Sequence, residues 1–140
     1  MKKISLFLAI VLCLTAFCAC KKEPEPPQQQ YEVKAITSEE AKPMIDSGEY
    51  ILLDVRTQEE YDEKHIPNCI HIPIDKNDVE PFKAEVQKQL TNKDAKIIVY
   101  CMSGFRSDIA AKAMSTLGYK TIYNMTDGIE GWQYDIVSSK

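Results

Sequence analysis

The chain is 140 residues long, carries a formal net charge of −4 and has 27% charged residues. That length suits one domain of ordinary size with a short additional segment. Basic residues do not cluster, so we exclude a nucleic-acid partner. The five cysteines and two histidines follow no metal-ligand spacing, and we expect neither a metal nor a cofactor.

Residues 1–19 have the features of a secretory signal peptide. The start is basic (Lys2, Lys3), and residues 4–19 are apolar apart from one serine and one threonine. This run is shorter than the roughly 20 residues that cross a bilayer. It therefore favours a signal peptide over the alternative, an uncleaved membrane anchor.

Cys20 is the expected site of lipidation. The segment Phe17-Cys18-Ala19-Cys20 resembles the cleavage box of bacterial lipoproteins, although Phe17 and Cys18 are less usual there. The resemblance implies an exported protein with an acyl chain on Cys20. It would be held at a membrane surface of the bacterial cell envelope, on the periplasmic or extracellular side. Residues 20–30 are rich in Pro and Gln and predict a tether.

Residues 31–136 are the predicted domain, with a tail at 137–140. Strands and helices are predicted to alternate along this domain. The expected order is a strand at 31–36, a helix at 37–47, a strand at 50–55, a short helix from 57, a strand at 69–72, a helix at 80–90, a strand at 97–100, a helix at 109–117, a strand at 121–123 and a helical turn at 127–132. Such alternation predicts a parallel sheet covered by helices on both faces.

Two capping boxes mark predicted helix starts, Thr37 with Glu40 and Thr57 with Glu60. Pro43 lies inside the first of these helices. Because proline removes an intrahelical hydrogen bond, we expect this helix to be divided into two short turns.

Cys101 lies where a buried strand ends and a loop leads into a helix. The free N–H groups and the dipole at a helix start favour an anion and lower the pKa of a thiol. Gly104 lets successive N–H groups converge, and Arg106 adds a positive charge suited to sulfur or phosphorus oxyanions. The plainer alternative is a buried cysteine that ends a core strand beside a solvated arginine.

We therefore predict that Cys101 is the nucleophile and that the rest of its loop binds substrate. The predicted substrate-binding residues are Met102, Ser103, Gly104, Phe105, Arg106 and Ser107.

This loop resembles the active-site loop of single-domain rhodaneses, which are thiosulfate sulfurtransferases. Further matches follow the family's order along the chain: Leu53-Asp54-Val55-Arg56 with Glu59, Glu60 and Tyr61; His65-Ile66-Pro67 with Ile72-Pro73; and Gly128-Ile129 with Trp132. The resemblance covers residues 36–132. It implies a three-layer α/β/α fold with a central five-stranded parallel sheet.

The resemblance also implies a reaction. Cys101 would take the outer sulfur of a donor such as thiosulfate as a persulfide and pass it to a thiol or cyanide. Arg106 would orient the donor, and the protein would act as a monomer on small molecules. One alternative is a phosphatase or arsenate reductase of related fold, but related phosphatases have five residues between Cys and Arg, whereas four intervene here. The other is a non-catalytic or redox-sensing binding module.

Asp54 and Arg56 end a strand at the same sheet edge as Cys101 and could contact substrate. The interpretation we favour is a structural network. In it, Arg56 would pair with Glu59 or Glu60, and Asp54 would accept hydrogen bonds from loop amides.

Other polar residues are given structural interpretations. Cys69 is interpreted as a core residue that forms no disulfide with Cys101. Cys69 would open its strand whereas Cys101 closes its own, which places the two at opposite edges of a parallel sheet, and the resemblance implies a further strand between them. His65 is expected to bond backbone, and Trp132 to fill the core. Asp127 stands where the family often has glycine; we expect it to cap the last helix, near enough to weaken anion binding.

Overall fold

The computed structural model describes residues 30–140, so the predicted signal peptide, Cys20 and almost all of the tether lie outside the described residues. The domain contains a five-stranded parallel sheet in the order β1-β5-β4-β2-β3. The strands are β1 (Val33–Ile36), β2 (Tyr50–Asp54), β3 (Ile70–His71), β4 (Lys96–Tyr100) and β5 (Thr121–Met125). The predicted α/β class and five-stranded parallel sheet are confirmed.

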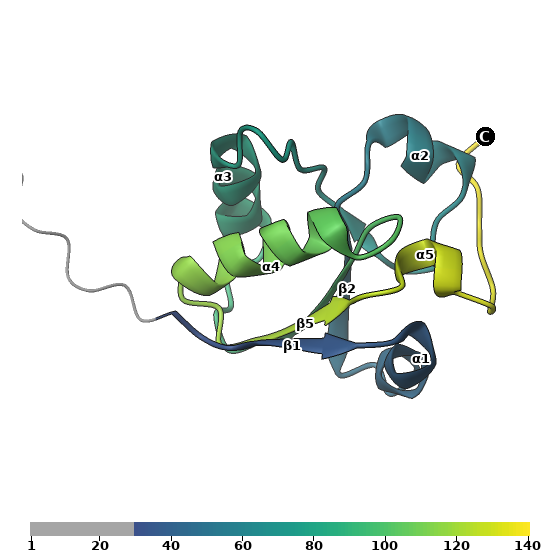
Figure 1. The fold of residues 1–140 in the computed structure, drawn as a ribbon, viewed down its shortest axis with the longest axis horizontal. Coiled ribbons are helices and arrows are strands. Elements are labelled where there is room, and N and C mark those ends of the chain that lie inside the picture. Colours follow the sequence, from purple (N-terminus) through teal and green to yellow (C-terminus); the bar gives the residue numbers. More distant parts are fainter. Residues whose placement is uncertain (1–29) are drawn as a thin grey trace, which may run out of the picture.

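Helices cover both faces of this sheet, as Figure 1 shows. The helices are α1 (Ser38–Asp46), α2 (Gln58–Glu63), α3 (Glu80–Gln89), α4 (Phe105–Thr116) and α5 (Gly128–Gly131). Helices α3 and α4 contribute to one buried cluster, and α1 and α5 contribute to another. Among residues 30–140, no helix is both long and apolar enough to span a membrane.

The central strand β4 supplies both clusters because its side chains alternate between the two faces. Ile97 and Val99 pack with α3 and α4, whereas Ile98 and Tyr100 pack with α1 and α5, and all four are fully buried. A short apolar run of this kind is typical of a parallel strand covered on both sides.

Both capping boxes are present, but the expected break at Pro43 is wrong. Helix α1 is continuous, with hydrogen bonds from Ala41 N to Thr37 O (2.9 Å) and from Ser47 N to Pro43 O (3.2 Å). Proline removes its own N–H only, and the bonds on either side persist.

The last residues pack against α2 and extend past the predicted domain end at residue 136 (Figure 1). Val137 exchanges backbone hydrogen bonds with His65 (2.8 and 2.9 Å). Ser138 Oγ and Ser139 N both donate to the carbonyl of Asp62. Part of the expected tail therefore holds the end of α2.

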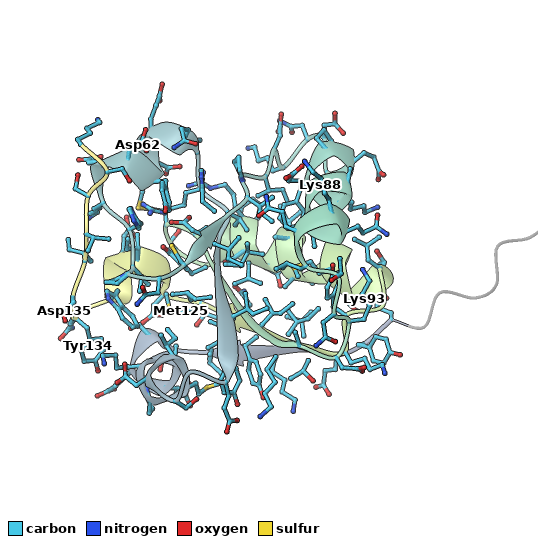
Figure 2. All side chains as sticks on the ribbon, turned by 180° about the vertical axis from the view of Figure 1, so that it is seen from behind. Asp62, Lys88, Lys93, Met125, Tyr134 and Asp135 are labelled. Atoms are coloured by element: carbon cyan, nitrogen blue, oxygen red, sulfur yellow. The ribbon has the colours of Figure 1, made fainter. Side chains whose placement is uncertain are left out.

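Figure 2 shows the molecule from behind, with its two ends on opposite sides of the view. Asp62 and Tyr134 lie at one end, and Lys88 and Lys93 lie at the other. Lys93 Nζ stands 3.7 Å above the ring of Tyr119, and burial lowers its pKa. Lys93 comes just before β4 and Cys101 just after it, so the two residues lie at opposite ends of that strand. We therefore interpret the end of the molecule that holds Lys93 as structural.

Candidate active site

Cys101 directly follows β4, and helix α4 begins four residues later at Phe105. The loop thus opens at the carboxyl edge of the sheet, where open α/β folds hold their ligands. Helix α4 begins at Phe105, four residues before the predicted apolar face starts at Ile109, so the loop is short and its last N–H groups belong to the first turn of the helix. The Cys101 residue is only 1% exposed.

The Cys101 thiol lies in a cup of hydrogen-bond donors. The Ser107 hydroxyl donates to Sγ over 3.4 Å. Hydrogen bonding from the backbone N–H groups of Ser107, Ser103 and Gly104 also favours the thiolate form and so lowers the pKa. Burial opposes ionisation of the thiol, but these hydrogen bonds outweigh it and lower the pKa of Cys101. Such a group is suited to act as a nucleophilic thiolate.

Two glycines let the chain approach this loop closely. Gly104 has φ +88°, and a Cβ there would lie 2.2 Å from Thr126 O. Gly128 has φ +57°, and a Cβ there would lie 2.2 Å from Met102 O. Only glycine is compatible with both demands.

Helix α5 holds the Cys101 loop in place through backbone hydrogen bonds. The N–H groups of Ile129 and Glu130 donate to the carbonyls of Cys101 (2.9 Å) and Met102 (3.2 Å). Asn124 Nδ2 donates to the carbonyl of Gly104 (3.2 Å). The sequence pointed to Gly128-Ile129 only as a family motif and gave no signal for Asn124, since both contacts join distant parts of the chain.

Arg106 is held by Glu60. Its two terminal nitrogens each donate to one carboxylate oxygen over 2.7 Å. This pairing is the main reason that the pKa of Glu60 falls to about 2, and it raises the pKa of Arg106. The same carboxylate accepts from Thr57 N (2.9 Å) in the capping box. Glu60 therefore pairs with the arginine of the loop, and the expectation that Glu59 or Glu60 pairs with Arg56 is wrong.

Asp54 and Arg56 form a buried ion pair, and both residues are 0% exposed. Arg56 Nη2 lies 2.6 Å from Asp54 Oδ2, and Arg56 also donates to the carbonyls of Glu60 (3.2 Å) and Lys64 (2.7 Å). Burial opposes the charge on Arg56, but Asp54 outweighs it and raises the pKa. Asp54 also accepts from the backbone N–H of Arg56, as expected for a structural network.

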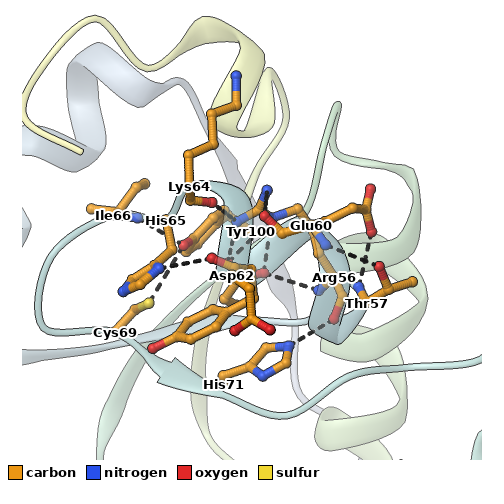
Figure 3. A network of polar contacts seen from close by, with 12 residues as sticks. Arg56, Thr57, Glu60, Asp62, Lys64, His65, Ile66, Cys69, His71 and Tyr100 are labelled. Atoms are coloured by element: carbon orange, nitrogen blue, oxygen red, sulfur yellow. Dashed lines mark hydrogen bonds and ion pairs between the residues drawn. The ribbon is translucent and has the colours of Figure 1, made fainter. Parts of the chain in front are cut away.

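Cys69 lies apart from the loop. Strand β2 separates β3 from β4, and Cys69 and Cys101 are both free. The prediction that Cys69 and Cys101 lie at opposite edges of the sheet is wrong, because the short strand β3 pairs with the carboxyl end of β2. Cys69 Sγ lies 3.5 Å from the hydroxyl of Tyr100 (Figure 3), and burial raises its pKa to about 11.

Three remaining polar predictions can be compared with the structure. His65 Nδ1 lies 2.9 Å from the Tyr61 carbonyl, and Trp132 is 9% exposed, as expected. The Asp127 side chain does not cap α5, contrary to expectation. It accepts from Ser38 N (2.8 Å) and Ser38 Oγ (2.6 Å), and so joins α5 to the start of α1.

A cavity of about 790 Å³ adjoins the loop. It lies between the start of α2, the segment that leads from β3 to α3, and the start of α4. The lining residues are Thr57, Gln58, Pro73, Ile74, Asp75, Lys76, Asp78, Pro81, Phe82, Phe105 and Arg106. Of the predicted substrate-binding residues, Phe105 and Arg106 face this cavity, whereas Ser107 is buried against Cys101.

The fold and the cysteine loop define a known class of domain. Residues 37–135 match the family model of the rhodanese-like domain, and the chain belongs to this family.

Individual relatives agree with this assignment. The chain is 30% identical to the thiosulfate sulfurtransferase GlpE of Coxiella burnetii over 100 residues, which cover 71% of this chain and 87% of GlpE. It is 36% identical to YrkF of Bacillus subtilis over 103 residues and spans about half (51%) of that protein. The crystal structure of a rhodanese-like domain protein from Staphylococcus aureus matches with a TM-score of 0.60 and 25% identity, covering 76% of this chain and 99% of that one.

Proposed function

We propose that this protein is a sulfurtransferase that carries a sulfane sulfur as a persulfide on Cys101. The observation that carries the proposal is the hydrogen bond from the Ser107 hydroxyl to the buried Sγ of Cys101 in the loop before α4, together with the lowered pKa of that thiol. Donors that stabilise the Cys101 thiolate can also stabilise the anionic outer sulfur of a persulfide, as an oxyanion hole stabilises oxygen.

The reaction would proceed in two displacement steps. The Cys101 thiolate attacks the outer sulfur of thiosulfate, the S–S bond breaks, and sulfite leaves with the bonding electron pair. A thiolate or cyanide acceptor then attacks the same sulfur and regenerates the Cys101 thiolate. A covalent intermediate between two substrates predicts ping-pong kinetics.

Two alternatives receive less support. A phosphatase or arsenate reductase would use its arginine to surround an oxyanion, but Glu60 already neutralises Arg106 by pairing with both of its terminal nitrogens, and only four residues separate Cys101 from Arg106. A non-catalytic binding module does not need a nucleophile, whereas Cys101 is present with a lowered pKa.

We further propose that the chain is exported and anchored through a lipid on Cys20. The support is the basic and apolar start of the sequence and the segment Phe17-Cys18-Ala19-Cys20. Expression of the full chain in a bacterium should place it in the membrane fraction, and Cys20→Ser should release it. Retention of the Cys20→Ser variant in that fraction would contradict lipidation.

The decisive test of sulfur transfer is intact mass spectrometry of the chain from Lys21 to Lys140, which holds every described element. Reduced protein treated with thiosulfate should gain the mass of one sulfur atom, and cyanide should remove it. Cys101→Ser should abolish the gain, whereas Cys69→Ser should leave it intact. Equal loss in both folded variants would contradict the assignment of Cys101.

A further inference from the structure

The charge near the candidate site is already balanced. Glu60 neutralises Arg106 through two hydrogen bonds of 2.7 Å, and their side chains are only 25% and 22% exposed. The other charged side chains that line the adjoining cavity are Lys76, Asp75 and Asp78. One lysine thus faces two aspartates, so a dianion that enters the cavity meets no net positive charge from its lining.

The cavity is also larger than a small oxyanion requires. Its volume of about 790 Å³ falls in the range of roughly 300–1,000 Å³ in which proteins bind organic molecules. Pro73 and Pro81 are exposed, and Phe105 is 65% exposed, an unusual state for a large aromatic side chain. These residues give the cavity an apolar wall that begins four residues after Cys101.

We propose that the donor site selects monoanionic organic sulfane-sulfur compounds, R–SO₂–S⁻ or R–S–S⁻ with an apolar R group, over dianionic thiosulfate. The inference rests on the proposed sulfur transfer to Cys101. The apolar group would lie against Phe105 and the two prolines, and the outer sulfur would face the Cys101 cup. Glu60 is the specificity-determining residue, because its charge cancels that of Arg106.

The reaction balances with such a donor. The Cys101 thiolate attacks the outer sulfur of R–SO₂–S⁻, and the S–S bond of the donor breaks. The electron pair of that bond leaves with the sulfinate R–SO₂⁻, while Cys101 becomes the persulfide anion. Two negative charges enter and two leave, so no proton, oxidant or reductant is required.

Three donors separate the effect of charge from that of the apolar group. Methanethiosulfonate replaces one charged oxygen of thiosulfate by a methyl group, and benzenethiosulfonate enlarges that group. Their kcat/KM values would be measured with cyanide as acceptor and divided by the rate of each donor with a free thiolate in solution. After this correction we expect benzenethiosulfonate to exceed thiosulfate at least tenfold.

Two variants test the named residues. Glu60→Gln should raise kcat/KM for thiosulfate about tenfold through a lower KM and change that for methanethiosulfonate by less than threefold. Glu40→Gln is the matched control, because Glu40 forms the same capping box with Thr37 (2.8 Å) at the start of α1. Phe105→Ala should lower the ratio of benzenethiosulfonate to methanethiosulfonate activity by about tenfold.

The outcomes distinguish this inference from the proposed function. If none of the three donors adds sulfur to Cys101, the sulfurtransferase proposal itself fails. If all three react but thiosulfate is preferred, or if Glu60→Gln leaves the preference of the wild type unchanged, the selectivity proposal is wrong and sulfur transfer stands.

Discussion

The hydroxyl of Ser107 lies 3.4 Å from Sγ of Cys101 and 3.1 Å from the carbonyl oxygen of Gly104. A serine hydroxyl has one proton to donate, so it can serve only one of these acceptors at a time. We infer that this proton turns towards Sγ when the thiol ionises. Ser107 is fully buried in the first turn of α4, so water does not compete for it.

This relationship predicts the effect of Ser107→Ala on the thiol. Loss of the hydroxyl should raise the pKa of Cys101 towards that of an ordinary thiol, because one donor to the thiolate is removed. A hydrogen bond to a charged group contributes about 1.5–3 kcal/mol, so alkylation by iodoacetamide at neutral pH should slow roughly tenfold. The measurement is the alkylation rate of Cys101 as a function of pH.

Ser103→Ala is the control for this change. Ser103 is exposed and points only its backbone N–H at Cys101, which alanine retains. An equal slowing in both variants would show that the Ser107 hydroxyl has no special role.

The buried Asp54–Arg56 pair predicts a stability effect. Arg56→Met should destabilise the fold by about 3–5 kcal/mol, because Asp54 would remain buried without its partner. Lys112→Met, which breaks the exposed pair with Asp108 (2.6 Å), should cost less than about 1 kcal/mol. Urea unfolding measures both. A stable Arg56→Met variant that has lost sulfur transfer would instead indicate a substrate contact.

Gly104 predicts a steric effect on stability that can be separated from the effect of its positive φ. Gly104 and Gly118 both have a positive φ, +88° and +91°, and an alanine at such an angle destabilises the fold by about 1–2 kcal/mol. A Cβ at Gly118 meets nothing within 4 Å, whereas at Gly104 it would lie 2.2 Å from Thr126 O. The free energy of unfolding should therefore fall by about 1–3 kcal/mol more in Gly104→Ala than in Gly118→Ala.

The same pair of variants checks the arrangement of the loop. Gly104→Ala should also slow persulfide formation, because the N–H groups around Cys101 would shift, while Gly118→Ala should retain the wild-type rate. Equal unfolding free energies for the two variants would contradict the close contact with Thr126.

The Glu60–Arg106 pair predicts a pH dependence of stability. The pKa of Glu60 is about 2 in the folded protein and has an ordinary value of 4.5. Because the folded value is the lower one, the stabilisation is complete above pH 4.5 and is lost as the pH falls towards 2. Near neutral pH the free energy of unfolding of the wild type should exceed that of Glu60→Gln by about 1–2 kcal/mol, after allowance for the partial exposure of the pair.

Urea unfolding of both proteins between pH 7 and pH 2 measures this difference, and subtraction removes the titration of the other carboxylates. The difference should shrink below pH 4.5. A difference that stays constant down to pH 2 would show that the charge of Glu60 does not stabilise the fold.

Short-range features of this protein follow from its sequence. The capping boxes at Thr37 and Thr57 each join residues three positions apart, a spacing that one helical turn fixes. The strand β4 follows from a short, β-branched apolar run, which is typical of a parallel strand covered on both faces, and Cys101 comes directly after it. These local rules are sufficient to predict the class of fold and to indicate the candidate nucleophile.

Tertiary structure alone decided which charged and polar groups meet. Arg56 had two candidate partners, Glu59 and Glu60, but it turned inward to Asp54, and the fold placed Arg106, 46 residues away, against the carboxylate of Glu60. Asp127 found Ser38 across 89 residues, although its position in sequence suggested a local cap. Such pairs depend on which segments the sheet brings together and which groups it buries, and neither can be read from spacing along the chain.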